Sequence, residues 1–216
     1  MVTRLAAERV GAGGSVTGVD VAPDMIEVAR GVEAPAAPSI EWHVADATAL
    51  PLADGTHDVV LCQMGLMFVP DRAAAVAEMR RVLAAGGRVV ISTPGRIQPP
   101  FELLEEAIVT HIGPELGGFV RAVFSLHDPD VLAALLRGAG LRDVSATVST
   151  TRVQLPAPAD FLWQYVSCTP MAPRVAAAGD AARAALEEQV VDAWRPFVTE
   201  ASTPVEQPMV TATGRR

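Results

Sequence analysis

Apolar residues in the first half of the chain follow two patterns, short continuous runs and helix-spaced stripes, and the two patterns alternate along the sequence. Four short runs, typical of β-strands, cover 15–20, 40–44, 58–62 and 88–92. Three stretches with helical spacing cover 2–10, 23–31 and 70–83. Strands that alternate with helices of this length predict right-handed β-α-β crossovers in a parallel sheet with helices on both faces.

Glycine and proline mark the ends of several of these elements. Gly11, Gly13 and Gly14 follow the first helix as a flexible loop, and the segment 35–38, with prolines at both ends, separates the second helix from the strand at 40–44. The pair at 86–87 is expected to cap the helix at 70–83. On the helix at 23–31 a buried stripe is expected to consist of Met25, Ile26, Val28 and Ala29.

The second half of the chain has a different pattern. Two apolar segments, 101–111 and 119–124, could form a mobile lid, and a helix begins at Asp128 and ends at 138–140. Residues 141–155 alternate as a long strand. An alanine-rich helical insertion follows at about 156–198, and a terminal strand is expected at 209–213. We therefore predict one α/β domain over 1–216, with a cofactor-binding half at 1–98 and a substrate-covering half at 99–216.

Composition limits the classes of partner. Of the 216 residues, 50% are hydrophobic and 19% are charged, as a buried sheet requires, yet no apolar stretch approaches the roughly 20 residues of a membrane helix. The start lacks the features of a signal peptide, so we expect a cytoplasmic protein. The net charge of −8 and the absence of a Lys/Arg run argue against general nucleic-acid binding. Small molecules are the expected partners.

The two cysteines, Cys62 and Cys168, lie outside any metal-ligand spacing. We expect reduced, mostly buried thiols and no metal site. An acidic residue follows each of the first two strands, Asp20 at the end of 15–20 and Asp46 shortly after 40–44, and Gln63 ends the third. Carboxylates at the carboxyl ends of parallel strands hold ribose hydroxyls in α/β folds, so this order points to a nucleoside-bearing cofactor.

Three segments in this order resemble the class I S-adenosylmethionine-dependent methyltransferases, in the branch that includes quinone-biosynthesis C-methyltransferases. The first is V-T-G-V-D-V-A-P-D-M-I-E-V-A-R, and the second is H-V-A-D-A-T-A-L-P-L-A-D-G-T-H-D-V-V-L-C-Q-M-G-L. The third is P-D-R-A-A-A-V-A-E-M-R-R-V-L-A-A-G-G-R-V-V-I-S. The resemblance covers about the first ninety residues. It implies a Rossmann-like sheet, S-adenosyl-L-methionine as cofactor and a small-molecule methyl acceptor.

The resemblance also implies roles for particular residues. Asp20 would accept hydrogen bonds from both ribose hydroxyls, since a carboxylate has two accepting oxygens. Val21 and Met25 would lie against the adenine. The alternatives are a solvated strand-end cap for Asp20 and ordinary core packing for Met25.

At the second strand end, the resemblance places Asp46 at the adenine amino group and the Ala47 backbone amide at a ring nitrogen. Gln63 would lie at the mouth of the site, near the methionine part of the cofactor. A helix or turn cap is the alternative role for Asp46.

The chain departs from the family pattern at its start. The family's first strand and D-x-G-x-G-x-G loop should precede the helix at 2–10, where Met1 stands. Gly11, Gly13 and Gly14 follow that helix and cannot replace the loop. We expect the strands that end at Asp20 and Gln63 to lack their shared neighbour, and we interpret the sequence as an N-terminally incomplete reading of a longer, active methyltransferase.

No catalytic side chain is required, because positioning and desolvation can supply much of the acceleration of methyl transfer from an activated cofactor. His111 and His127 could act as general bases for an acceptor that needs one, although a helix-start role suits His127 better. Three aromatic side chains could line an apolar acceptor pocket or simply pack between helices: Trp163, Tyr165 and Trp194.

Three classes of function compete. A small-molecule methyltransferase is favoured by the ordered motifs. A nicotinamide oxidoreductase would need G-x-G-x-x-G before its first helix, and no such run occurs. A non-catalytic relative that acts through association is the third, because the glycine loop is absent. An exposed gap in the sheet would also invite a homo-oligomer.

Overall fold

The structure is a computed structural model that describes residues 2–32, 39–199 and 202–216. Met1 and the proline-bounded break at 35–38 lie outside the described residues. The chain divides into two compact units. Unit 1 contains 1–91, 133–145 and 212–216, and unit 2 contains 92–132 and 146–211. The assignment of 1–216 to one domain stays a prediction.

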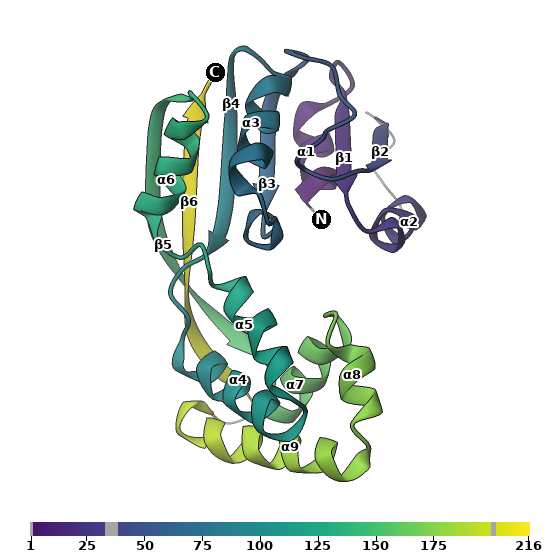
Figure 1. The fold of residues 1–216 in the computed structure, drawn as a ribbon, viewed down its shortest axis with the longest axis vertical. Coiled ribbons are helices and arrows are strands. Elements are labelled where there is room, and N and C mark those ends of the chain that lie inside the picture. Colours follow the sequence, from purple (N-terminus) through teal and green to yellow (C-terminus); the bar gives the residue numbers. More distant parts are fainter. Residues whose placement is uncertain (1, 33–38, 200–201) are drawn as a thin grey trace. The chain divides into compact units, whose positions relative to one another are not determined.

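The elements follow the predicted order closely, and Figure 1 traces them along the chain. The first seven, with one short 3-10 helix, are α1 (Val2–Val10), β1 (Val16–Asp20), α2 (Pro23–Gly31), β2 (Ile40–Val44), β3 (His57–Gln63), η1 (Leu66–Phe68) and α3 (Arg72–Val82). The middle of the chain forms β4 (Leu83–Pro94), α4 (Pro99–His111), η2 (Pro114–Leu116), α5 (Gly117–Val123), α6 (Pro129–Gly138) and β5 (Arg142–Leu155). The last elements are α7 (Pro158–Ser167), α8 (Ala172–Ala177), α9 (Asp180–Trp194), η3 (Arg195–Phe197) and β6 (Thr203–Arg215).

The strands form two separate sheets. In the first, β1 and β2 pair in parallel, from Val16 opposite Ile40 to Asp20 opposite Val44. The second has four strands in the order β3-β4-β6-β5. Across the part of the chain that the structure describes, no strand joins β1 to β3.

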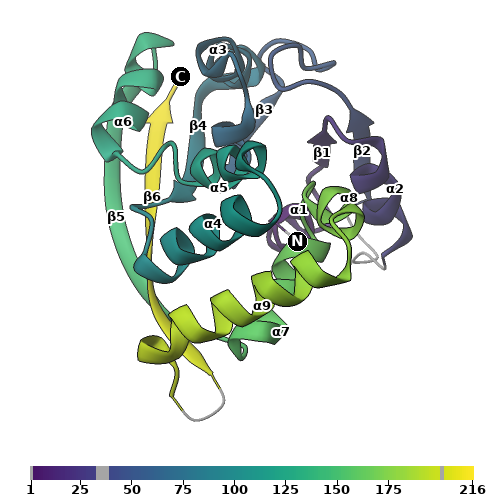
Figure 2. The same ribbon diagram turned by 60° about the horizontal axis from the view of Figure 1, so that its bottom comes forward.

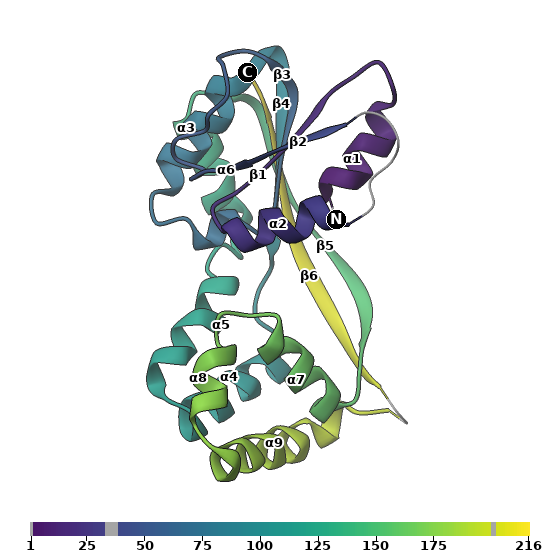
Figure 3. The same cartoon turned by 90° about the vertical axis from the view of Figure 1, so that its right-hand side faces the viewer.

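Unit 1 exposes apolar side chains that a closed sheet would cover. Helices α1 and α2 contact β1 and β2, as Figure 3 shows. On β3, Val59 and Leu61 are 39% and 46% exposed. These two residues lie two apart, so they share one face of the strand. The missing neighbour therefore leaves apolar surface as well as backbone groups uncovered.

Two predictions about unit 1 were wrong. On α2 only Ile26 is fully buried, whereas Met25 and Val28 are 60% and 64% exposed, because the helix meets the β1–β2 sheet through the Ile26 side. The glycine pair 86–87 does not cap α3 but lies inside β4. There it pairs with the last residue: Gly86 N–H donates to the Arg216 carbonyl, and Arg216 N–H donates to the Gly87 carbonyl.

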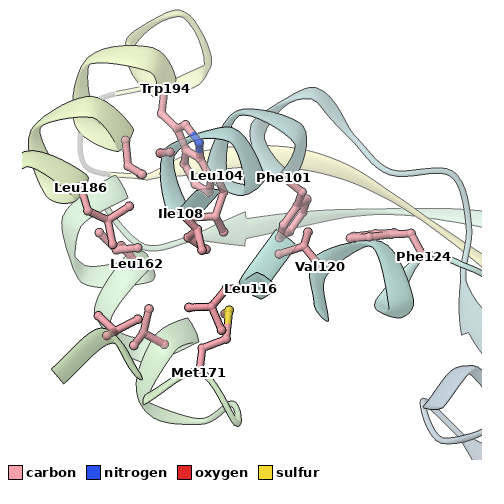
Figure 4. Close-up of a cluster of buried hydrophobic side chains, with 14 residues drawn as sticks. Phe101, Leu104, Ile108, Leu116, Val120, Phe124, Leu162, Met171, Leu186 and Trp194 are labelled. Carbon is pink, nitrogen blue, oxygen red and sulfur yellow. The ribbon is translucent and has the colours of Figure 1, made fainter. Parts of the chain in front are cut away.

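Unit 2 is built around helices. The segments 101–111 and 119–124 lie largely in α4 and α5, and the insertion after residue 156 is helical as predicted. Helices α4 and α9 lie side by side, and α7 contacts α9 (Figure 2). Their facing side chains form one apolar cluster, shown in Figure 4, with Phe101, Leu104, Ile108, Leu162, Leu186 and Trp194 among its members.

Two smaller differences occur in the second half. The last strand begins at Thr203, six residues before the predicted start at 209, because polar and proline residues hide its alternation. Cys168 is exposed at the end of α7, so the expectation of two mostly buried thiols was wrong for this cysteine. Cys62 is half-buried on β3.

Candidate functional site

The two acidic strand ends of unit 1 lie close together. Asp20 is the last residue of β1 and Asp46 follows β2 by two residues. The parallel register aligns Asp20 with Val44, and the Ala45 N–H donates a 3.0 Å hydrogen bond to the Asp20 carbonyl. This bond ties the two strand ends to each other. The structure thus brings together two of the carboxylates that the sequence singled out.

The Asp20 side chain is half-buried and partly engaged. Its Oδ1 accepts a 2.9 Å hydrogen bond from the Ala22 backbone N–H at the start of α2. This is the strand-end cap expected as the alternative role. A carboxylate has two oxygens with about four acceptor sites, so this one bond fixes the side chain and leaves capacity for a ligand. The cap and a binding role are therefore compatible.

Two apolar side chains flank the start of α2. Val21 and Met25 are 66% and 60% exposed. Pro23 is the first residue of the helix, so Val21 and Met25 stand four residues apart at the helix entry. The alternative that Met25 is an ordinary core residue was wrong. Exposed apolar side chains beside a strand-end carboxylate form a surface suited to a flat, partly apolar ligand.

Asp46 is exposed and fixed by its own turn. Its Oδ1 accepts 2.8 Å hydrogen bonds from both the backbone N–H and the hydroxyl of Thr48. The bond from the Thr48 backbone, followed by the one from its hydroxyl, lowers the pKa of Asp46 below its usual value. The turn-cap role is therefore present, and it keeps the carboxylate charged. Ala47, between these two residues, is half-buried.

A polar network anchors the segment after Asp46 to α3. The Leu50 N–H donates to Glu78, and the Arg81 guanidinium donates to the carbonyls of Leu50 and Leu52. Arg81 also pairs with Glu78 and Asp54 at 2.6 Å each. The hydrogen bond from Arg81 lowers the pKa of Glu78 more than its desolvation raises it. These contacts hold the stretch from 50 to 54 in place.

Gln63 is exposed at the end of β3. The next residue, Met64, was not identified from the sequence. Its φ angle is +54°, in the left-handed region that residues other than glycine rarely adopt. Nothing in the local pattern Q-M-G-L signals this conformation, since the neighbouring glycine would be the expected place for it.

The histidines of unit 2 each have one ring nitrogen engaged. His111 Nε2 lies 2.6 Å from the Gln189 Oε1, and His127 Nδ1 donates to the Phe124 carbonyl at 2.9 Å. The first contact links α4 to α9, and the second closes the turn before α6. Both contacts explain these histidines as structural residues, and a general-base role for either stays a prediction.

The three aromatic residues that the sequence suggested for an acceptor pocket, Trp163, Tyr165 and Trp194, have different surroundings. Trp194 is fully buried in the apolar cluster, so it supports helix packing. Tyr165 stacks on Phe161 with ring centroids 5.7 Å apart. The Trp163 indole N–H donates to Glu187, and the Arg183 guanidinium lies 5.1 Å from the centre of its ring.

The described residues contain neither a metal-ligand cluster nor a membrane-spanning helix. Among residues 2–32, 39–199 and 202–216 there is no group of three or more His, Cys, Asp or Glu side chains arranged to hold a metal ion. No helix in the same ranges has the length and apolar character needed to cross a bilayer.

Comparisons with known proteins find similarity to methyltransferases. A family model described as a methyltransferase domain matches residues 1–91. A demethylmenaquinone methyltransferase of Thermus thermophilus is 32% identical over 140 residues, which cover 59% of this chain and 64% of the relative. A ubiquinone/menaquinone biosynthesis C-methyltransferase of Desulfotalea psychrophila is 34% identical over 142 residues, 60% of this chain and 56% of the relative. The chain thus spans less than two thirds of the length of these relatives.

Similarity in structure covers more of the chain than similarity in sequence does. The crystal structure of a candidate methyltransferase from Bacillus halodurans C-125 matches with a TM-score of 0.56, covering 94% of this chain and 83% of that one. The sequence identity is 15%, so this likeness shows the fold alone. It confirms the predicted α/β Rossmann-like architecture.

Proposed function

We propose that this protein is a class I S-adenosylmethionine-dependent methyltransferase that transfers a methyl group to a small quinone-type acceptor. The proposal is supported by the methyltransferase family model that matches residues 1–91 and by the relatives named above. One observation carries the proposal. The acidic strand ends at Asp20 and Asp46 are tied together by the Ala45 hydrogen bond, beside the exposed apolar residues Val21 and Met25. The quinone class follows from the names of the relatives.

The residues fit a nucleoside. Asp20 has acceptor capacity for two vicinal hydroxyls beyond its bond to Ala22. Val21 and Met25 offer apolar contact to a flat ring. Asp46, held charged by Thr48, can accept from an exocyclic amino group, and the Ala47 amide lies next to it. Gln63 is proposed to contact the methionine part of the cofactor.

Methyl transfer from this cofactor requires no catalytic side chain. When bound, the cofactor supplies an electrophilic methyl group. The residues of this chain then need to hold the cofactor in line with the acceptor and exclude water, which can supply much of the rate acceleration. Unit 2, with its helical insertion, is the part of the chain proposed to cover the acceptor.

We further propose that the active protein contains a strand between β1 and β3. Neither strand has a partner on that side in the described residues, and a cavity of about 410 Å³ has lining residues from both, including Val16, Thr17 and His57. Unpaired backbone groups are costly when buried, so these edges favour an additional strand. A strand from the same polypeptide or from a second copy would satisfy both edges.

Isothermal titration with S-adenosylhomocysteine tests the cofactor site. We expect the Asp20→Ala substitution to weaken binding about 10-fold or more, since hydrogen bonds to a charged group contribute about 1.5–3 kcal/mol. Asp24→Ala is the control, because Asp24 is another acidic residue near the start of α2; it is exposed and has no proposed contact. Its affinity should equal that of the unaltered protein.

The same titration on a protein extended upstream tests the additional strand. Binding by the extended protein alone would support that strand, whereas equal binding by both would show that the cofactor site is complete without it. If neither well-folded protein binds, the methyltransferase proposal fails and a role through association is favoured. Sedimentation of the 216-residue chain shows whether a second copy pairs with the open edges.

A further inference from the structure

The connection between β2 and β3, residues 45–56, contains neither helix nor strand, yet its backbone is held at many points. Connecting segments of this kind are usually more mobile than the elements that they join. Without a helix or strand, their backbone N–H and C=O groups need partners elsewhere. In this protein several of those partners lie in the last turns of α3.

Two side chains of α3, Glu78 and Arg81, hold the middle of this connection. Glu78 Oε2 accepts a 2.8 Å hydrogen bond from the Leu50 N–H. Arg81 donates to the carbonyls of Leu50 and Leu52 at 3.0 and 2.7 Å. The guanidinium also forms two bonds to the Glu78 carboxylate, at 2.6 and 2.8 Å, so the two side chains form one planar bidentate pair.

Both peptide planes that flank Leu50 are fixed by this pair. Its N–H belongs to the plane before it and its C=O to the plane after it, and each is bound by a side chain of α3. The Glu78 and Arg81 side chains are only 19% and 29% exposed, whereas Asp54, the other carboxylate bound by Arg81, is 73% exposed. Ion pairs open to water contribute little to stability, so the shielded contacts around Leu50 dominate the network.

The residues held by α3 follow directly on the turn that carries Asp46. A 3.0 Å hydrogen bond from the Ala49 N–H to the Asp46 carbonyl closes this turn, and Leu50 comes next in the chain. At the other end, the Ala45 N–H is bonded to the Asp20 carbonyl. The turn is therefore fixed on both sides, by β1 before it and by α3 after it.

We propose that Glu78 and Arg81 are positioning residues for adenine recognition, an inference that rests on the proposed function. They act through the turn, where the Asp46 carboxylate and the Ala47 amide offer an acceptor and a donor to the adenine edge. Recognition by such a pair requires that both groups be held in place by the contacts behind them. A loose turn should lose the preference for adenine before it loses affinity for the rest of the cofactor.

Discrimination between adenine and hypoxanthine tests this role. S-inosylhomocysteine has a carbonyl where S-adenosylhomocysteine has the amino group, so the Asp46 carboxylate would meet an acceptor instead of a donor. The unaltered protein should bind S-adenosylhomocysteine about tenfold or more tightly than this analogue, because a site built to bond an amino group rejects a ligand that lacks it.

Arg81→Met should weaken this preference. The Kd for S-adenosylhomocysteine is expected to rise about threefold to tenfold, and that for S-inosylhomocysteine by about twofold or less. Isothermal titration measures both values, and thermal unfolding gives the Tm of each protein. A loss of stability alone would raise both Kd values by the same factor, so the ratio of the two values reports positioning.

Asp71→Ala is the matched control for stability. Asp71 caps the other end of the same helix, where its Oδ1 accepts a 2.9 Å hydrogen bond from the Ala74 N–H. Loss of such a cap destabilises the helix, so the Tm should fall. The ratio of the two Kd values should stay within twofold of that of the unaltered protein.

Two milder substitutions guard against a fold that does not survive Arg81→Met. Arg81→Lys keeps the charge but loses the planar fork, and Glu78→Gln keeps an acceptor for the Leu50 N–H but loses the charge. Both should reduce the preference for adenine by less than Arg81→Met does. An unchanged Kd ratio in the folded variants overturns the inference, and so does an equal rise of both Kd values.

The proposed function can fail separately. If the unaltered protein binds neither ligand, as the 216-residue chain or extended upstream, the methyltransferase proposal fails and the positioning role fails with it. If the unaltered protein prefers S-adenosylhomocysteine and the variants keep that preference, only the inference about Glu78 and Arg81 fails.

Discussion

The interactions within unit 1 differ from those within unit 2. Unit 2 buries a continuous apolar cluster between α4, α7 and α9, with Leu104 and Trp194 fully covered. Unit 1 leaves apolar residues such as Leu61 and Val28 exposed, and its loop at 50–54 is fixed by a polar network around Arg81. The candidate cofactor residues all lie in unit 1. The candidate ligand chemistry thus lies in the unit that leaves more of its large apolar side chains exposed, although this unit also buries residues such as Leu66, Val76 and Ile91.

Replacing one leucine by alanine in each unit should give the largest difference in the free energy of unfolding. Leu104→Ala in unit 2 is expected to lower the free energy of unfolding by about 3–4 kcal/mol, because it leaves a cavity in a packed core. Leu61→Ala in unit 1 should change it by about 0.5 kcal/mol or less, since this side chain is 46% exposed. Urea denaturation followed by circular dichroism measures both.

The Leu61 result also reports on the open edge of β3. A loss similar to that of Leu104→Ala would contradict the contrast between the units. It would mean that another strand or a second copy covers Leu61 in solution.

Removing the guanidinium of Arg81 should have a smaller effect, confined to unit 1. Arg81→Met is expected to lower the free energy of unfolding by less than Leu104→Ala, because Glu78 and the carbonyls of Leu50 and Leu52 lose their donor. The change also has a pH signature. The pKa of Glu78 is lower in the folded protein than in the unfolded chain, so its contribution is present above the ordinary glutamate pKa and is lost as pH falls through the folded value.

Urea denaturation at several pH values tests this signature. Between neutral pH and about pH 4, the unaltered protein should lose more stability than Arg81→Met does. Glu78→Gln serves as the control and should resemble Arg81→Met on the acid side. If the free energy of unfolding depends on pH in the same way in all three proteins, the polar network around Arg81 is excluded as a source of stability.

The smallest expected effect concerns the one tyrosine of the chain. Burial, followed by the nearby Cys168, raises the pKa of Tyr165 to about 12. The unfolded chain therefore loses its phenolic proton first, so stability should fall as pH rises from about 10 toward 12. Absorbance at 295 nm gives the titration directly, with the urea-unfolded protein as reference. A folded-state midpoint near 10 would show that water reaches this side chain.

Local patterns account for what the sequence predicted well. The strands at Val16–Asp20 and Ile40–Val44 and the helix at Arg72–Val82 match their predicted positions because hydrophobic periodicity is a property of neighbouring residues. The acidic strand ends could be found for the same reason, since parallel strands bring their carboxyl ends to one edge of a sheet.

Long-range contacts account for what was missed. The glycines at 86 and 87 look like a helix cap, and only their pairing with Arg216 makes them part of β4. The exposure of Met25 depends on which side of α2 meets the sheet. The left-handed conformation of Met64 depends on the turn between Cys62 and Leu66. The neighbouring residues in the sequence do not predict this conformation.

The strand order has a consequence for how this protein is made on the ribosome. Strand β6 is synthesised after β3, β4 and β5, yet it lies between β4 and β5 in the four-stranded sheet. Strand β5 must therefore wait for residues 203–215 before it acquires a neighbour, and β4, which already lies beside β3, keeps its other edge unpaired until then. Sheets that depend on such distant pairing form slowly and leave edges open to aggregation meanwhile. The helices of α4 and α5 can form during translation, but the sheet is completed only after residues 203–215 have emerged.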